Sequence, residues 1–454
     1  MKVTRRELLR GAGTLAGAVL LGDTHVIGAN KWITNGRRAV AAPRGSDSGP
    51  LSGTNLYEDI ITYYNLGEHR TATEGDLKTS QWLLEQLRRA GSKATQQSFS
   101  LRQFFVRQTK LTLADRNIRA FPLWFPRSTG IVPIAGTLVS LEMTRESTSS
   151  LRGKLALVKF PADAGGAMVE GSIHSKLIRA AATAGASAVI AISEGPTKEI
   201  VALNSPAGSE PWPIPVVLTG QRDEPYLGDA VKSGAKVTLL LEGDDDKDAK
   251  AKNVIARVDR GGKDLIVVST PQSGWFRCAA ERGPGIALFL GLARWANRRP
   301  SGASFLFVST SGHEIGGLGM QAFLKELAPT PDRVLCWIHL GAGIASYAWE
   351  ETQSGPRRLQ EPDSRRLLMT SPDLVPLLTT TLAGQPGLTP TVGRAVGEFE
   401  LILKAGYRGF GIAAAHRFHH TPADSPEMTG PEIIEPVGRA LVSTLEAVQQ
   451  GSKG

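Results

Sequence analysis

The chain has 454 residues, two cysteines and a formal net charge of +9. Residues 1–45 hold eight Lys or Arg and two acids, so the rest carries only +3, which excludes a long phosphate-binding stripe and a nucleic-acid partner. Two cysteines exclude a disulfide framework, and about 410 residues after the amino-terminal segment exceed one hydrophobic core, so two or three domains are expected.

The amino-terminal residues have the pattern of a twin-arginine export signal. Arg5 and Arg6 precede a nearly uncharged run of Gly, Ala, Leu and Val over residues 11–22. That run is about a dozen residues long, whereas a membrane-spanning helix needs roughly 20, so we expect membrane contact only through export. The sequence therefore predicts a periplasmic or extracellular protein.

The next elements change character along the chain. Leucines at helical spacing predict a helix over 76–90, and alternating residues predict a strand over 94–101. Short strands around one helix, 175–184, then predict a small α/β unit, and the acidic run 244–248 marks its expected end. We expect a signal over 1–29, a linker over 30–50, a larger domain over 51–106 and 249–454, and an insert over 107–248.

Strands and helices alternate regularly in the second half of the chain. This alternation predicts an α/β fold with a mostly parallel sheet covered by helices on both faces. Functional groups collect at the carboxyl ends of the strands in such sheets. The expected strands are 253–258, 264–270, 304–309 and 333–339, and the expected helices are 285–297, 318–327 and 430–449.

Two polar segments follow expected strands and are candidates for a site. Ser311-Gly-His-Glu314 places an imidazole beside a carboxylate on a Gly-rich turn, as a metal ligand next to a base would require, although a helix cap gives the same pattern. His419-His-Thr-Pro-Ala-Asp424 offers a ligand with a carboxylate to orient it, or an ordinary surface loop. His339 lies on an apolar strand, where a hydrogen-bonded core histidine is the commoner outcome.

Taken together, these segments resemble the co-catalytic zinc peptidases of family M28, which include aminopeptidases and the glutamate-carboxypeptidase and transferrin-receptor-like relatives. The resemblance begins at 64–76, resumes at Asn253-Val-Ile-Ala-Arg257 and covers nearly all of 55–450. The block over 136–241 looks like an inserted protease-associated domain. The resemblance implies a zinc exopeptidase fold.

The family's metal ligands map unevenly onto this chain. Pro271-Gln-Ser273 stands where the first zinc histidine and its supporting aspartate are expected, so that ligand is absent. The resemblance places Glu281 at the bridging aspartate, His313-Glu314 at the Glu-Glu pair of base and ligand, His339 at the second-metal aspartate, and His420 at the closing histidine. A complete two-zinc centre is therefore not expected.

The first function that this site implies is an aminopeptidase acting on a peptide or small amide substrate. Glu281, Glu314 and His420 would hold one zinc ion, with His339 as a fourth candidate ligand, and His313 would accept the proton of the metal-bound water. The alternative is a catalytically inactive relative that serves as a binding module, favoured by Pro271 and Ser273.

The cysteines leave two interpretations open, and the sequence does not determine the substrate or the oligomeric state. Cys278 and Cys336 each lie three residues before a candidate ligand, so they could form a disulfide or add soft ligands. Two buried, inert thiols are the alternative.

Overall fold

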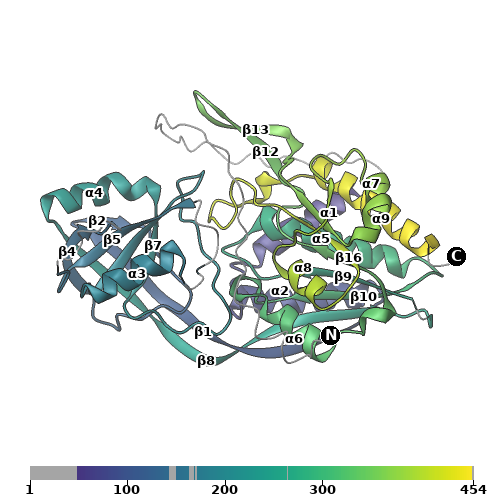
Figure 1. Cartoon of the computed structure of the whole chain (residues 1–454), viewed down its shortest axis with the longest axis horizontal. Helices are drawn as coiled ribbons and strands as arrows, with labels where there is room; N and C mark the ends of the chain where they lie inside the picture. The colour runs from purple at the N-terminus through teal and green to yellow at the C-terminus, as the bar shows by residue number, and fades with distance from the viewer. Residues whose placement is uncertain (1–48, 143–149, 163–167, 169–170, 263, 452–454) are drawn as a thin grey trace.

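The computed structural model describes residues 49–142, 150–162, 168, 171–262 and 264–451. Within these residues the chain forms a larger and a smaller lobe, joined by two long antiparallel strands, β1 (Lys93–Leu113) and β8 (Lys236–Val258) (Figure 1). The predicted signal and the linker up to residue 48 lie outside them. Among the described helices, none has the length and apolarity that crossing a bilayer requires.

The larger lobe is built on a mixed sheet with the strand order β15-β14-β16-β11-β9-β10-β8. Its four central strands run parallel, and β8 and β14 flank them in antiparallel pairing. The prediction of a mostly parallel α/β sheet is therefore confirmed. The remaining strands are β9 (Leu265–Pro271), β10 (Ser304–Thr310), β11 (Val334–Leu340), β14 (Leu367–Thr370), β15 (Pro390–Thr391) and β16 (Gly409–Ala413).

Helices cover both faces of this sheet. Side chains alternate across a strand, so Ile266 and Val268 of β9 pack on one face while Leu265 and Val267 pack on the other. The first face is covered by α1 (Gly53–Asn65), α2 (Glu74–Arg89), α5 (Ala279–Asn297), α7 (Val375–Thr381) and α9 (Pro431–Gly451), and the second by α6 (Leu318–Glu326) and α8 (Glu398–Lys404).

Most elements expected from the sequence are present, with two differences. The acidic run 244–248 does not end an element, because it lies inside β8, where Arg102 and Arg107 of the paired strand bind two of its carboxylates. The helix expected from residue 285 begins at Ala279, so Glu281 lies in its first turn and Pro284 inside it.

In the smaller lobe the sheet continues from β8 through β4 (Ile134–Ser140). Strand β4 and the strands β5 (Leu155–Phe160), β6 (Ala188–Ser193) and β7 (Val216–Gly220) are parallel, with α3 (Ile173–Thr183) and α4 (Glu224–Ser233) packed on them (Figure 1). The predicted small α/β unit is present in this form. The paired long strands β1 and β8 extend through both lobes, so the transition between the lobes falls within strands.

A two-stranded hairpin, β12 (Tyr347–Thr352) and β13 (Gly355–Pro362), projects from the larger lobe (Figure 1). The sequence analysis did not anticipate it, nor helix α1. The hairpin's charged residues mask the strand alternation, because it is largely exposed.

Candidate functional site

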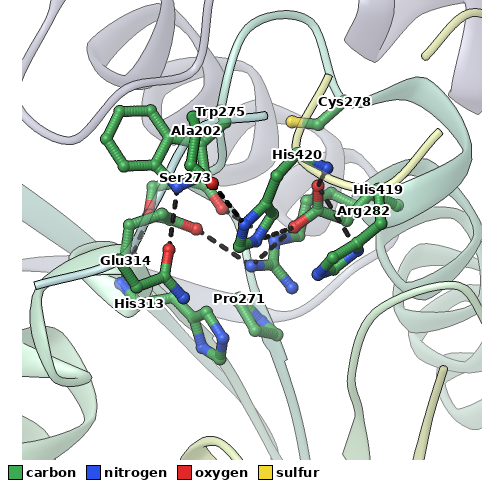
Figure 2. A network of polar contacts seen from close by, with 12 residues as sticks. Ala202, Pro271, Ser273, Trp275, Cys278, Arg282, His313, Glu314, His419 and His420 are labelled. Carbon is green, nitrogen blue, oxygen red and sulfur yellow. Dashed lines mark hydrogen bonds and ion pairs between the residues drawn. The ribbon is translucent and has the colours of Figure 1, made fainter. Parts of the chain in front are cut away.

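The candidate site lies beyond the carboxyl ends of β9 and β10, as the open sheet predicts. Four segments meet there: the turn after β9 with Ser273, the turn after β10 with Glu314, the first turn of α5, and the loop with His420 (Figure 2). Cys278 and His420 have positive φ values of 29° and 59°. A left-handed backbone is costly for residues other than glycine and is concentrated at functional sites.

Arg282 lies at the centre of these segments with its side chain only 1% exposed. Its Nη2 is 3.0 Å from Oε1 of Glu281 and 2.9 Å from Oε1 of Glu314, and its Nε donates to the Ser273 carbonyl at 2.9 Å (Figure 2). Burial opposes the charge, but the two carboxylates outweigh it and raise the pKa of the guanidinium. The site therefore contains a fixed cation, for which the sequence analysis gave no role.

Ser273 holds Glu314 in place. Its hydroxyl donates to Oε2 of Glu314 at 2.7 Å and accepts from the backbone N–H of Gly312 at 3.0 Å. Gly312 and Gly316 adopt left-handed conformations that close the tight turn around Glu314. Both carboxylate oxygens of Glu314 thus have partners within the protein.

Glu281 faces two histidines on its other side. Its Oε1 is 3.5 Å from Nε2 of His420, and its Oε2 is 3.8 Å from Nδ1 of His419. One ligand atom from each of these three residues lies within 4.8 Å of the others. Two ligands about 2.1 Å from one ion at a tetrahedral angle lie about 3.4 Å apart, so the two distances suit a single zinc-sized ion.

His420 is oriented by the smaller lobe. Its Nδ1 lies 3.0 Å from the carbonyl oxygen of Ala202, and its own carbonyl accepts from the Ala202 N–H at 2.9 Å. A carbonyl only accepts, so Nδ1 carries a proton, and the ring turns its other nitrogen, Nε2, toward Glu281. Metal-binding histidines are commonly held in this way, through the ring nitrogen that does not bind the ion.

The electrostatics of the group also suit a cation. Burial raises the pKa of the Glu281 carboxyl, but neighbouring cationic groups, among them the permanently charged Arg282, hold it well below its ordinary value, so Glu281 is ionised. Burial and the neighbouring His420 lower the pKa of His419, which is therefore neutral and able to act as a ligand. Two carboxylates thus face one guanidinium, and this excess of negative charge would attract a further cation. These residues fit one metal ion.

His313 and His339 are not part of this group of three. Nδ1 of His313 is 3.4 Å from Oε1 of Glu398, and burial and Arg282 lower the pKa of the imidazole to about 3. Nδ1 of His339 is 2.9 Å from the hydroxyl of Ser269, and burial lowers its pKa to about 4. Both imidazoles are neutral at pH 7.

No family model and no curated protein matches the sequence. Among solved structures, the chain is similar to a zinc aminopeptidase from Bacillus subtilis, with TM-score 0.70 and 17% identity over 88% of this chain and 96% of that one. It is also similar to a peptidase M28 precursor from Shewanella amazonensis, with TM-score 0.66 and 16% identity over 87% of this chain and 92% of that one. An aminopeptidase from Aneurinibacillus sp. has TM-score 0.60 and 18% identity over 88% of this chain and 94% of that one.

The chain has the fold of the zinc aminopeptidases. At such identities the similarity concerns the fold alone, so the chemistry must come from this chain's own residues.

The structure brings together only part of the ligand set expected from the sequence. Glu281 and His420 face each other, whereas Glu314 is paired with Arg282 and Ser273, and His339 is bonded to Ser269. His419, which the sequence analysis left without a role, completes the group instead. Its place directly before His420 was the only signal for it in the sequence.

Two expectations about neighbouring residues are also resolved. Within the described residues, Asp424 has no hydrogen bond or ion pair with His419 or His420; its carboxylate accepts from the backbone N–H groups of Ala280 and Glu281 at 2.9 Å, and its Oδ2 lies 3.5 Å from Nε2 of His416. Cys278 and Cys336 are free, buried thiols, and the hydroxyl of Tyr63 lies 3.2 Å from the sulfur of Cys278. The interpretation as buried thiols is therefore confirmed.

Asp76, a buried acid behind the turn that carries Glu314, makes stability depend on pH. Its carboxylate accepts from Ser311 at 2.7 Å and Gln272 at 3.2 Å, and burial raises its pKa to about 7. An unfolded aspartate has a pKa of about 3.9, so between about pH 4 and pH 7 the folded protein holds a proton on Asp76 that the unfolded chain has lost. The free energy of unfolding therefore falls as the pH rises toward 7.

Urea unfolding of the wild type and Asp76→Asn at about pH 5 and about pH 8 tests this dependence. Between about pH 5 and about pH 8, the free energy of unfolding of the wild type should fall by about 2–3 kcal/mol more than that of the variant. A difference between the two proteins that does not change with pH would contradict the assignment.

Proposed function

We propose that the chain is an exported metal-dependent hydrolase that releases residues from peptide amino termini, with one zinc ion held by Glu281, His419 and His420. The observation that carries the proposal is the grouping of three ligand atoms: one each from Glu281, His419 and His420 lies within 4.8 Å of the others, and His420 Nε2 is 3.5 Å from Oε1 of Glu281. One carboxylate and two imidazoles are a common ligand set for zinc. The similar zinc aminopeptidases support zinc as the bound ion and amide hydrolysis as the reaction.

The surrounding residues have distinct roles in this proposal. Zinc in a three-ligand site would lower the pKa of a bound water and polarise the amide carbonyl. His313 accepts the proton as a neutral imidazole, and Glu398 orients its ring. A base whose pKa is about 3 holds a proton weakly, so we expect slow turnover.

We also propose that the smaller lobe is the protease-associated domain that the resemblance implies, and that it forms one wall of the site. Ala202 bonds His420, and the N–H of Ser205 donates to the Glu314 carbonyl at 2.9 Å. Trp275, which packs edge-on to His420, bonds Asn204 of the same segment at 2.8 Å.

Elemental analysis of the purified full chain tests the metal site. We expect about one zinc per chain, lost in His419→Ala and His420→Ala and retained in Glu314→Gln. Loss of zinc in Glu314→Gln but not in His419→Ala would contradict the proposed ligands and favour the set expected from the sequence, Glu281, Glu314 and His420. Wild-type protein without metal would favour the binding module.

Aminopeptidase assays with a panel of aminoacyl p-nitroanilides test the reaction. His313→Ala should keep its zinc and lose about 100-fold or more of kcat, the usual range for removing a general base. Unchanged kcat would exclude His313 as the proton acceptor.

A further inference from the structure

Glu281 lies between two different groups. On one side it faces His419 and His420, at 3.8 and 3.5 Å. On the other, its Oε1 is 3.0 Å from Nη2 of Arg282. A carboxylate shared by two cations is the usual feature of two-metal hydrolytic sites. Glu281 has this position between the guanidinium of Arg282 and the candidate metal site.

The second position is enclosed by the protein. Nη2 of Arg282 also lies 2.9 Å from Oε1 of Glu314, while Nη1 is buried and has no hydrogen-bond partner among the described residues. Arg282 directly follows Glu281 on α5 and reaches a carboxylate 32 residues further along the chain. Its side chain is 1% exposed, so this cation cannot exchange with solvent.

We propose that Arg282 takes the place of a second metal ion between Glu281 and Glu314 and thereby limits the site to one exchangeable ion. The proposal deepens the proposed function, on which it rests for the ion at His419 and His420. It explains why Glu314 is present without being free to bind metal: its carboxylate neutralises the guanidinium.

The residues around Arg282 could bind a metal if the guanidinium were absent. Glu281 and Glu314, which lie 3.0 and 2.9 Å from the same Nη2, would lose their shared cation. Two carboxylates that share one position can bind a divalent ion there. Removing the guanidinium should therefore create a second metal site.

Arg282→Met tests this, because methionine keeps much of the apolar volume of arginine and removes its charge. The full-length variant, purified with zinc, is analysed for metal content, and its melting temperature is measured with and without added zinc. We expect about two zinc ions per chain against about one in the wild type. Without zinc the variant should melt at a lower temperature, and added zinc should raise this temperature more than in the wild type.

Two further variants serve as controls. Arg294→Met removes an ion-paired arginine from the same helix, whose Nη2 lies 3.0 Å from Oδ1 of Asp59, and should lose stability without gaining zinc. Arg282→Met combined with Glu314→Gln removes the cation and one carboxylate together, and should fold with about one zinc ion.

Each outcome decides the proposal. A wild type without zinc and an Arg282→Met variant with one ion would support the role of Arg282 and overturn the proposed function. An unchanged zinc count in Arg282→Met would overturn the role of Arg282 alone. Failure of Arg282→Met to fold even with zinc would also overturn it, because zinc could not then replace the guanidinium.

Discussion

Glu281→Gln should lose the bound metal and much of the stability of the protein, because Glu281 faces both candidate ligands and Arg282. Removing a partner that only orients a ligand costs roughly 10–100-fold in metal affinity, so loss of a charged ligand should cost about 100-fold or more. Arg282 would keep only Glu314 as a carboxylate partner, beside its hydrogen bond to the Ser273 carbonyl. Breaking a buried ion pair costs about 3–5 kcal/mol, and we expect the lower end because one carboxylate remains.

Zinc titration and urea unfolding of Glu281→Gln measure both effects. Glu446→Gln is the matched control, since that glutamate is 38% exposed and pairs with one surface arginine, Arg299. The control should retain zinc and stay within about 0.5 kcal/mol of the wild type. If Glu281→Gln bound zinc as tightly as the control does, Glu281 would not be a ligand.

The larger lobe could be predicted from sequence because its strands and helices are buried on regular faces. The leucines of α2 and the apolar runs of β9 and β10 are buried in the core, so their spacing in the sequence predicts the helix and the strands. The acidic run inside β8 misled the prediction, because charges usually end a strand. Here the paired arginines of β1 lie more than 130 residues away in sequence.

The site was harder to predict because its decisive contacts join distant segments. The sequence analysis gave Arg282 no role, because its contact with Glu314 exists only once β10 and α5 lie side by side. The start of α5 was placed too late, since Gly283-Pro-Gly285 is typical of a turn. The role of Ala202 could not be foreseen, because a backbone carbonyl leaves no mark in the sequence.

The resemblance selected His420 and passed over His419. A match of sequence positions identifies one histidine, whereas metal binding depends on how the loop orients both imidazole rings. The two rings stack with centroids 4.0 Å apart, and both turn a nitrogen toward Glu281. The positive φ of His420 makes this presentation possible, and sequence periodicity cannot predict it.

Asp424→Asn should weaken both the fold and the metal site, because Asp424 anchors the first turn of α5. Its Oδ1 accepts from the N–H of Ala280 and its Oδ2 from the N–H of Glu281, both at 2.9 Å. Asparagine would place an NH₂ group against one of these donors and remove the negative charge from the helix amino terminus. An unsatisfied buried donor costs about 1–3 kcal/mol and the charge up to about 2, so we expect a loss of about 2–4 kcal/mol.

The same substitution should lower zinc affinity about 10–100-fold without touching a ligand, since the backbone of Glu281 loses its anchor. Zinc titration and urea unfolding are compared with Asp248→Asn, which alters an exposed aspartate paired with Lys250 and should leave both properties unchanged. A variant that unfolds early but binds zinc normally would show that Asp424 supports only the helix. Loss of both properties would show that the loop carrying His419 and His420 also positions Glu281 through the backbone, so that one segment organises all three ligands.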